Sequence, residues 1–143
     1  MKGVIAAAGR GSRLFPITKT VSKHLLPIYN KPLIYYPITT LINSGITDIC
    51  IVTNPNEINL YKQLLGNGSN YGCNFEFCEQ KKPKGIPDVL NYAKKVFGNV
   101  PVTLILGDNI FASSDLLSNS KNTKDLNGAK IFATQVEDPS RFG

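Results

Sequence analysis

The sequence predicts an α/β fold built around a doubly wound, mostly parallel sheet. Short apolar runs alternate with segments whose apolar residues recur at helical spacing, which is the pattern of strand–helix–strand units. Residues 102–106, "VTLIL", are almost wholly apolar, as central strands of parallel sheets are. The 143 residues suffice for one hydrophobic core, and no repeat or second domain is evident, so residues 1–143 are expected to form one domain.

The first half of the chain predicts two strands and a helix. Residues 4–8 are an apolar run ended by glycines, as expected of a buried strand. Residues 33–43 have apolar side chains at helical spacing, and Gly45 fits the C′ position of that helix. Pro37 falls close enough to the first turn to be tolerated. Residues 48–53, "DICIVT", predict the second strand.

The second half continues the alternation. Residues 57–65 predict a short helix that the loop "GNGSNYG" ends, and residues 74–78 alternate as a third strand does. Residues 86–97 have one apolar face and predict another helix, which leads to the strand at 102–106. Residues 129–136 are expected to be a fifth strand, after a polar and mobile segment at 116–127. In such a sheet, ligands bind beyond the carboxyl ends of the strands.

The positive charge is concentrated in the first third of the chain. The net charge is +6, and from Asp48 onward ten basic residues balance ten acidic ones. A localised excess of this kind favours a small molecule that carries a polyphosphate. Nucleic acid is disfavoured, because no basic-aromatic stripe or known module is present. The basic residues that precede the first acid are Lys2, Arg10, Arg13, Lys19, Lys23 and Lys31.

Composition also points to a cytoplasmic protein without a membrane partner. No apolar run has the length of a membrane span, and the N-terminus lacks the pattern of a signal peptide. The cysteines Cys50, Cys73 and Cys78 are odd in number and lack metal-ligand spacing, so reduced thiols are expected.

The stretch "AAAGRGSRLFP" is a candidate phosphate-binding loop. Gly9 and Gly11 allow backbone N–H groups to approach a ligand, and Arg10 and Arg13 supply cationic donors for phosphate oxygens. The loop is neither a P-loop, which requires Gly-Lys-Ser/Thr, nor a dinucleotide fingerprint, which requires glycine at Leu14 and a later acid. The alternative is a tight turn with two solvated arginines.

Three further positions follow or border strand ends. Lys23 in "SKHLLP" could neutralise phosphate, Gln80 in "EQKKPKG" could pair with the edge of a base, and Asp108 in "LILGDN" could hold a divalent cation. The respective alternatives are a solvated lysine, an exposed loop glutamine and an Asp–Asn turn. Because parallel strands end at one edge of a sheet, these positions are expected to meet. His24 lacks the partners of a catalytic triad and is expected to be a loop side chain.

The whole chain resembles the sugar-1-phosphate nucleotidyltransferase family, and its thymidylyl branch most of all. The signature "AAAGRGSRLFPITKTVSKHLLPIYNKPLIYYPI" begins the similarity, and "LINSGITDICIVTNP", "LLGNGSNYG", "EQKKPKGIPD", "LILGDNIF" and "VEDPSRFG" continue it in order. The resemblance implies a Rossmann-like, GT-A-like nucleotidyltransferase fold. It also implies transfer of a nucleotidyl group from dTTP to glucose 1-phosphate, which gives dTDP-glucose and pyrophosphate.

The resemblance also implies site residues. The backbone of Ala8, Gly9, Gly11 and Ser12 would hold the triphosphate, and Arg13 would clamp the pyrophosphate leaving group. Lys23 would neutralise charge at the reacting phosphates, so Arg13 and Lys23 would be the catalytic pair. The remaining roles are Gln80, Pro83 and Gly85 for the nucleotide base, Asp108 for Mg²⁺ and the nucleotide, and Asn109 and Gly143 for the sugar.

Three departures from the family pattern leave alternatives open. Ala8-Gly9 replaces the usual Gly-Gly of the thymidylyl branch, and the uridylyl branch accepts Ala-Gly, so UTP is an alternative to dTTP. Pro87 replaces a usual alanine at a helix start, where proline is acceptable. Family members are about twice as long, so the chain resembles an N-terminal portion without the Glu–Lys pair for the sugar phosphate and the second metal-binding aspartate.

These departures lead to expectations about activity and assembly. The chain alone is expected to bind nucleotide better than it catalyses transfer, and a bare strand edge at 129–136 is expected to favour self-association. The full-length protein is expected to be a homo-oligomer. The alternative from another class is a non-catalytic nucleotide-binding subunit.

Overall fold

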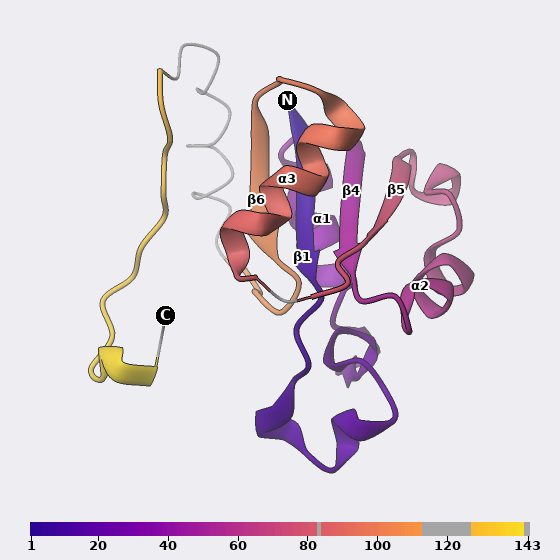
Figure 1. The fold of residues 1–143 in the computed structure, drawn as a ribbon, viewed down its shortest axis with the longest axis vertical. Helices are drawn as coiled ribbons and strands as arrows, with labels where there is room; N and C mark the ends of the chain where they lie inside the picture. Colours follow the sequence, from indigo (N-terminus) through magenta and orange to yellow (C-terminus); the bar gives the residue numbers. More distant parts are fainter. Residues whose placement is uncertain (83, 113–126, 142–143) are drawn as a thin grey trace.

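A computed structural model describes residues 1–82, 84–112 and 127–141. Four parallel strands form the central sheet in the order β5-β4-β1-β6 (Figure 1): β1 is Lys2–Ala7, β4 is Asp48–Thr53, β5 is Asn74–Glu79 and β6 is Val102–Leu106. Every pairing is parallel, and β1 lies between β4 and β6. The chain builds outward from β1 to β5 and then returns to the other side of β1. This reversal confirms the doubly wound fold and puts a topological switch point between β1 and β6.

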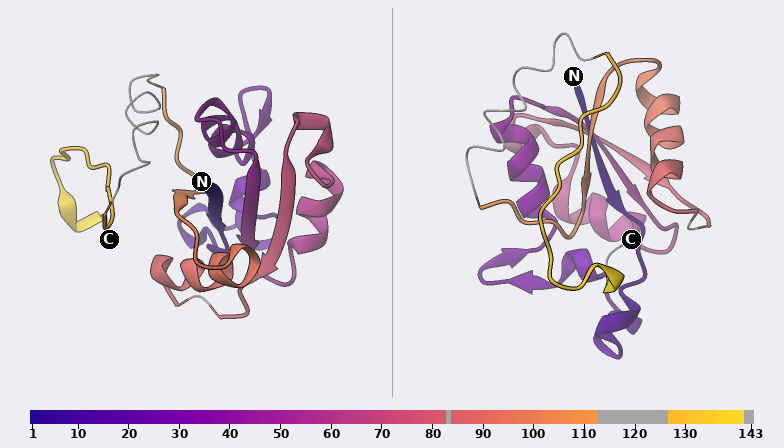
Figure 2. Two further views of the ribbon diagram at one scale, coloured as in Figure 1. Left: turned by 90° about the horizontal axis from the view of Figure 1, so that it is seen from above. Right: turned by 90° about the vertical axis from the view of Figure 1, so that its left-hand side faces the viewer.

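Helices cover both faces of the sheet (Figure 2). The helices α1, Tyr35–Asn43, and α2, Ile58–Leu65, pack on one face, where Ile38, Tyr61 and the strand residue Ile5 are fully or almost fully buried. The helix α3, Ile86–Phe97, covers the other face through Val89 and Ala93. Burial of both faces explains why the central strands β1 and β4 have so few polar residues.

Most predicted elements are confirmed, three of them without any change of boundary: β4, α3 and β6. The strand β1 begins two residues before the expected start, and β5 extends one residue further, to Glu79. The helix α1 begins at Tyr35 rather than 33, and the N–H groups of Leu33 and Ile34, just ahead of it, donate to the carbonyls of Leu26 and His24 at 2.9 and 2.8 Å. Gly45, with φ of 76°, ends this helix as expected.

The prediction of a fifth strand at 129–136 is wrong. This segment is extended but forms no ladder with the described part of the chain, and the side chain of Ile131 is 86% exposed. Figure 1 and the left view of Figure 2 show the described segment 127–141 standing apart from the sheet. A strand exists only where a neighbour supplies hydrogen bonds, and local β propensity does not supply that neighbour. The polar segment predicted at 116–127 lies almost entirely outside the described residues.

The connection from β1 to α1 carries short elements that the sequence pattern did not indicate. They are three 3₁₀ turns, Ser12–Leu14, Ile17–Lys19 and Lys23–Leu25, and an antiparallel pair of two-residue strands, β2 (Pro27–Ile28) and β3 (Lys31–Pro32). Among the described residues, no helix is both long and apolar enough to cross a membrane.

Candidate functional site

The loops after β1 and β6 meet at the switch point of the sheet. The N–H of Gly107 donates to the carbonyl of Ala6 at 2.9 Å, which continues the β1–β6 pairing one residue beyond the strand. Just beyond this contact, Lys23 Nζ donates to Asp108 Oδ2 at 2.5 Å. Two of the predicted site residues are therefore joined across the edge where a doubly wound sheet binds its ligands.

The stem of Lys23 lies along the glycine loop. A Cβ at Gly11, which has φ of 61°, would lie 3.1 Å from Lys23 Cβ and 3.1 Å from Thr18 Cγ2, and one at Gly9 would lie 3.9 Å from Lys23 Cε. The carbonyl of Gly11 accepts hydrogen bonds from Leu14 N at 2.9 Å and Thr18 Oγ1 at 2.7 Å. Both the backbone conformation and the available space thus favour glycine at position 11.

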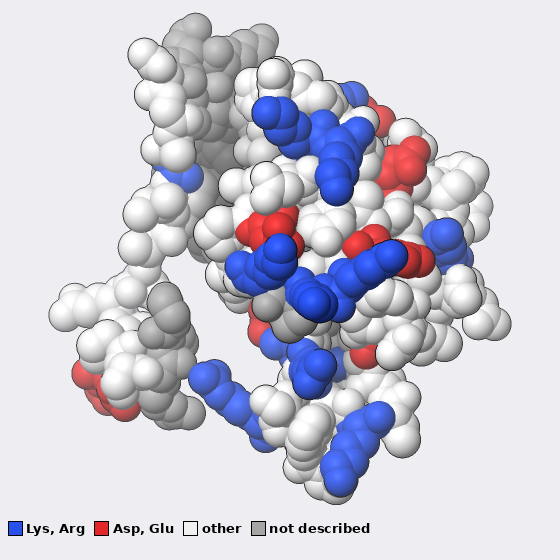
Figure 3. Space-filling view, viewed as in Figure 1, with Lys and Arg blue, Asp and Glu red and all other residues white. Residues whose placement is uncertain are grey.

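Charge is unequally distributed around this edge. Burial raises the pKa of the Asp108 carboxyl, but the hydrogen bond and the charge of Lys23 outweigh burial and hold the pKa below its usual value. The carboxylate is therefore ionised at neutral pH. In Figure 3 basic side chains cross the front of the molecule and continue onto the loop after β1 at the bottom of the view, where little acidic surface is visible. This distribution favours an anionic ligand near the glycine loop.

A hollow of about 250 Å³ brings six predicted site residues together. Its other walls are mostly apolar, with Ile86 and Val89 of α3 and Leu106 of β6, and the ring of His24 also lines it. Apolar walls beside a cation and a carboxylate suit a ligand with a flat apolar part and a charged part. The six predicted residues are Ala8, Gly9, Lys23, Gln80, Gly85 and Asp108.

Gln80 is a buried residue and not the exposed loop glutamine of the alternative interpretation. Its side chain is 5% exposed, its N–H donates to Thr53 O at 2.8 Å, and its Nε2 donates to Asp88 Oδ2 at 2.8 Å. Gly85 directly precedes α3 with φ of 86°, a conformation that favours glycine. Asp88 was not identified from the sequence, although an acid in the first turn of a helix is itself a recognisable signal.

The structure leaves other predicted residues outside the hollow. Ser12 and Arg13 are exposed on the loop after β1 and line neither this hollow nor the larger one beside it. Asn109 is also exposed, and its N–H donates to Leu106 O at 3.1 Å. Pro83 and Gly143 lie outside the described residues.

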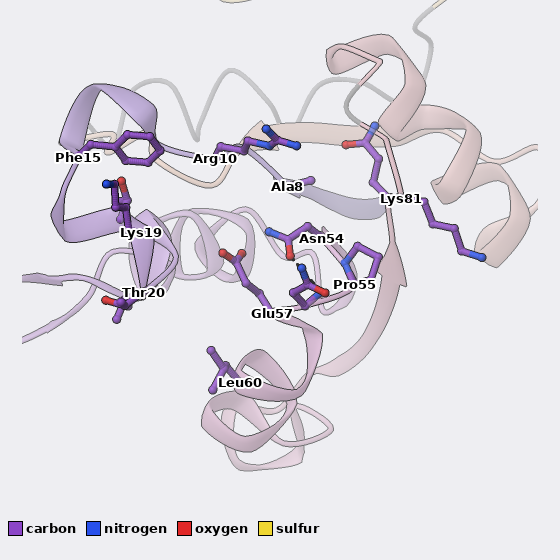
Figure 4. A pocket seen from close by; sticks show the side chains of 14 residues that line it. Ala8, Arg10, Phe15, Lys19, Thr20, Asn54, Pro55, Glu57, Leu60 and Lys81 are labelled. Carbon is purple, nitrogen blue, oxygen red and sulfur yellow. Dashed lines mark hydrogen bonds between the residues drawn. The ribbon is translucent and has the colours of Figure 1, made fainter.

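The larger hollow, of about 660 Å³, adjoins the first one, since Ala8 and Gln80 line both. Figure 4 shows Arg10 on the side of the loop after β1 and Asn54 and Glu57 on the side of the loop after β4. Burial raises the pKa of the Glu57 carboxyl, and its Oε2 has no hydrogen-bond partner in the described part of the chain. Arg10 was identified from the sequence, but Asn54 and Glu57 were missed, although "TNPNE" ends a predicted strand just as the identified positions do.

His24 lies in the turn Lys23–Leu25 of the connection after β1, as expected of a loop side chain, and it is almost fully buried. It is 1% exposed, and its Nδ1 lies 3.3 Å from Ser22 Oγ and 3.2 Å from Tyr61 OH. Burial, assisted by the nearby charge of Lys23, lowers the pKa of His24 to about 4. The ring is therefore neutral at pH 7 and anchors the turn that carries Lys23. As expected, the three cysteines are free thiols.

A doubly wound sheet with a basic glycine loop and an ionised aspartate at its switch point is characteristic of nucleotide-binding proteins. The chain belongs to the nucleotidyl transferase family, whose family model matches residues 2–143.

The relatives are similar along the whole chain. Glucose-1-phosphate thymidylyltransferases from Neisseria meningitidis and Mycolicibacterium smegmatis are 44% and 43% identical to it, across 100% of this chain and 50% of each relative. A Bacillus anthracis structure described as a glucose-1-phosphate thymidylyltransferase in complex with sucrose matches 87% of this chain and 51% of that protein, with 40% identity and a TM-score of 0.79. A UDP-glucose pyrophosphorylase complexed with UDP-glucose matches with 31% identity and a TM-score of 0.72, across 87% of this chain and 53% of that one. The chain thus spans about half the length of the relatives it matches.

Proposed function

We propose that this chain forms the nucleotide-binding portion of an enzyme that transfers a thymidylyl group from dTTP to glucose 1-phosphate. The products are dTDP-glucose and pyrophosphate. The 44% identity to a thymidylyltransferase along the whole chain supports this reaction. The sheet order β5-β4-β1-β6 also supports it, because it creates the switch point at which a nucleotide can bind. In the reaction, a phosphate oxygen of the sugar attacks the α-phosphorus as the bond to the β-phosphate oxygen breaks, and pyrophosphate leaves.

The ion pair between Lys23 and Asp108 is the observation that carries the proposal. The two side chains come from opposite sides of the switch point and meet at 2.5 Å beside the glycine loop. A triphosphate accompanied by a divalent cation satisfies both groups, since phosphate oxygens suit the ammonium and the cation suits the carboxylate. Exchange of partners on binding would direct Lys23 toward the charge that develops on the phosphates, which is where such reactions need stabilisation.

Mg²⁺ fits this site with one protein carboxylate, that of Asp108, and with the phosphates of a bound triphosphate as its other ligands. Within the described residues, no group of three or more His, Cys, Asp or Glu side chains could hold a metal ion together. Mg²⁺ is commonly held by one or two carboxylates plus substrate phosphates, so Asp108 with a triphosphate meets the minimum. Asp108 would hold the ion, which neutralises phosphate charge when bound.

The other roles in the proposal belong to residues in or near the 250 Å³ hollow: Gly9, Gln80 and Gly85 line it, whereas Gly11, Arg13 and Asn109 do not. Gly9 and Gly11 leave backbone accessible to the triphosphate, and Arg13 supplies a further cation for the pyrophosphate. Gln80 and Gly85 face the pyrimidine. Asn109 and, outside the described residues, Pro83 and Gly143 keep the roles implied by the family resemblance.

Transfer from UTP is the second candidate. It is favoured by Ala8-Gly9 and by the likeness to UDP-glucose pyrophosphorylase, although the 31% identity to that protein is below the 40% of the thymidylyltransferase structure. Thymine and uracil present the same hydrogen-bonding edge, so the groups around Gln80 suit either base.

Calorimetric titration with dTTP, UTP, ATP and GTP in the presence of Mg²⁺ tests the proposal. We expect the pyrimidine nucleotides to bind at least about tenfold more tightly than the purine nucleotides. Pyrophosphate release on addition of glucose 1-phosphate then distinguishes an enzyme from a non-catalytic binding subunit. Equal affinities for all four nucleotides, or binding of none, would contradict the proposed site.

The proposal extends to cellular context. Three free thiols support a cytoplasmic location, since disulfides are rare there. We also propose that residues 1–143 act as one nucleotide-binding unit and that the full-length protein is a homo-oligomer.

A further inference from the structure

The amide of Gln80 is held from two sides. Its backbone is fixed by the hydrogen bond to Thr53 at the end of β4, and its side chain is 5% exposed at the junction of the two hollows. Its Nε2 donates to Asp88 Oδ2 at 2.8 Å. The side chain that faces the proposed base is thus tied to the first turn of α3.

The charge of Asp88 decides which end of the amide faces it. An ionised carboxylate only accepts hydrogen bonds, so the NH₂ group of Gln80 must take that side, since a carbonyl oxygen there would be repelled. The carboxylate is itself oriented, because Asn91 Nδ2 donates to Asp88 Oδ1 at 3.3 Å and the residue lies in the first turn of a helix. The hydrogen bonds from Gln80 and then Asn91 hold the pKa of Asp88 below its usual value, so the carboxylate is charged at neutral pH.

The fixed amide has a consequence for the choice of base. A freely rotating glutamine amide can pair with N3–H and O4 of thymine or uracil, and after rotation it can pair equally with N3 and the amino group of cytosine. With the NH₂ group committed to Asp88, Oε1 is the part of the amide left to meet position 3 of a pyrimidine. An oxygen there accepts from the N3–H of thymine and uracil but faces the lone pair of cytosine N3.

We propose that Asp88 is a positioning residue that fixes the amide of Gln80 and thereby makes the site select thymine and uracil over cytosine. This inference rests on the proposed function, because it requires that a pyrimidine lie against Gln80. Beyond the proposed function, it states that the site excludes cytidine nucleotides, and it assigns this exclusion to Asp88, which does not line the hollow.

The test measures the affinities of dTTP and CTP for the wild-type chain and for Asp88→Asn, by calorimetry without sugar phosphate. Asparagine has the same shape but presents either oxygen or NH₂ to Gln80, so the amide becomes free to rotate. We expect the wild-type protein to prefer dTTP over CTP by about tenfold or more, and Asp88→Asn to reduce this preference to about twofold or less. The smaller preference should come mainly from tighter binding of CTP to Asp88→Asn. Damage to the structure would weaken the binding of both nucleotides and would not tighten that of CTP.

Glu76→Gln is the matched control. It removes the same charge from an exposed position of β5, the strand that leads to Gln80, and should leave the preference unchanged. A wild-type preference that persists in Asp88→Asn would overturn the inference and leave the proposed function intact. Failure of the wild-type chain to bind either nucleotide would overturn both.

Discussion

The two sides of the turn Lys23–Leu25 differ in exposure, in charge and in hydrogen-bond partners. Lys23 points outward, with its side chain 23% exposed, and pairs with Asp108. His24 points inward, is 1% exposed, and lies against the hydroxyls of Ser22 and Tyr61. The outer side supplies a charge to the candidate site, and the inner side, although the ring of His24 also lines the 250 Å³ hollow, fixes the backbone from which that charge projects. Changes on the outer side should therefore affect binding, and changes on the inner side should affect stability.

The largest expected effect is the loss of stability at acidic pH that His24 causes. The pKa of His24 is lowered from 6.5 to about 4 in the folded protein, so between these values the unfolded chain binds a proton that the folded chain does not. Stability should fall as pH decreases from 6.5 to about 4, by about 3 kcal/mol in total. Urea unfolding at a series of pH values measures this slope. His24→Gln, which cannot titrate, should flatten it, and equal slopes in both proteins would refute the assignment.

Removal of the outward charge should give the next largest effect, in ligand affinity. Lys23→Ala should weaken dTTP binding by about 1.5–3 kcal/mol, because a charge-assisted hydrogen bond is lost beside an aspartate left unpaired. Arg13→Ala is expected to fall in the same range. Lys31→Ala is the matched control, since Lys31 belongs to the same basic segment but lies over the ring of Tyr36 at 4.6 Å. Calorimetric affinities that are unchanged in both Lys23→Ala and Arg13→Ala would exclude the phosphate-binding role.

A substitution at Gly107, which lies between His24 and Asp108, should affect both the stability of the fold and the affinity for dTTP. A Cβ at Gly107 would lie 2.8 Å from His24 Cδ2 and 3.1 Å from Ala6 O, so Gly107→Ala should destabilise the fold by about 1–3 kcal/mol. Because Asp108 is the next residue, dTTP affinity should decrease as well. Thermal unfolding of the single variant and of the double variant with His24→Ala measures the coupling. If removal of the ring does not reduce the cost of Gly107→Ala, the proposed overlap is not the cause.

The smallest expected effect belongs to the hydroxyl of Tyr61. Tyr61→Phe removes the 2.9 Å contact with Ser22 Oγ and should cost about 1 kcal/mol of unfolding free energy without changing dTTP affinity. Tyr35→Phe offers a comparison in which a less buried hydroxyl, 3.1 Å from Tyr71 OH, is removed. A decrease in dTTP affinity in Tyr61→Phe would show that the inner cluster also takes part in binding.

The local sequence pattern was sufficient to predict the bounds of a helix or strand wherever the residues that specify them lie within one segment. The bounds of β4, α3 and β6 could be predicted because apolar periodicity and flanking glycine or proline specify them locally. The doubly wound topology followed from the alternation of such segments. Since parallel strands end at one edge, the meeting of Gly9, Lys23, Gln80 and Asp108 at one hollow could also be expected before their contacts were known.

Only the tertiary structure decided the partners. Lys23 and Asp108 are 85 positions apart, and nothing local to either one indicates that they pair. The burial of His24 and the hydrogen bond from Gln80 to Asp88 were likewise open, as was the absence of a ladder between 129–136 and the described part of the chain. Each residue type involved is common both in solvent and in contact. A charge, an amide or an extended segment has a preferred chemistry but no preferred partner, and the partner is set by which other segments the packed sheet brings within hydrogen-bonding distance.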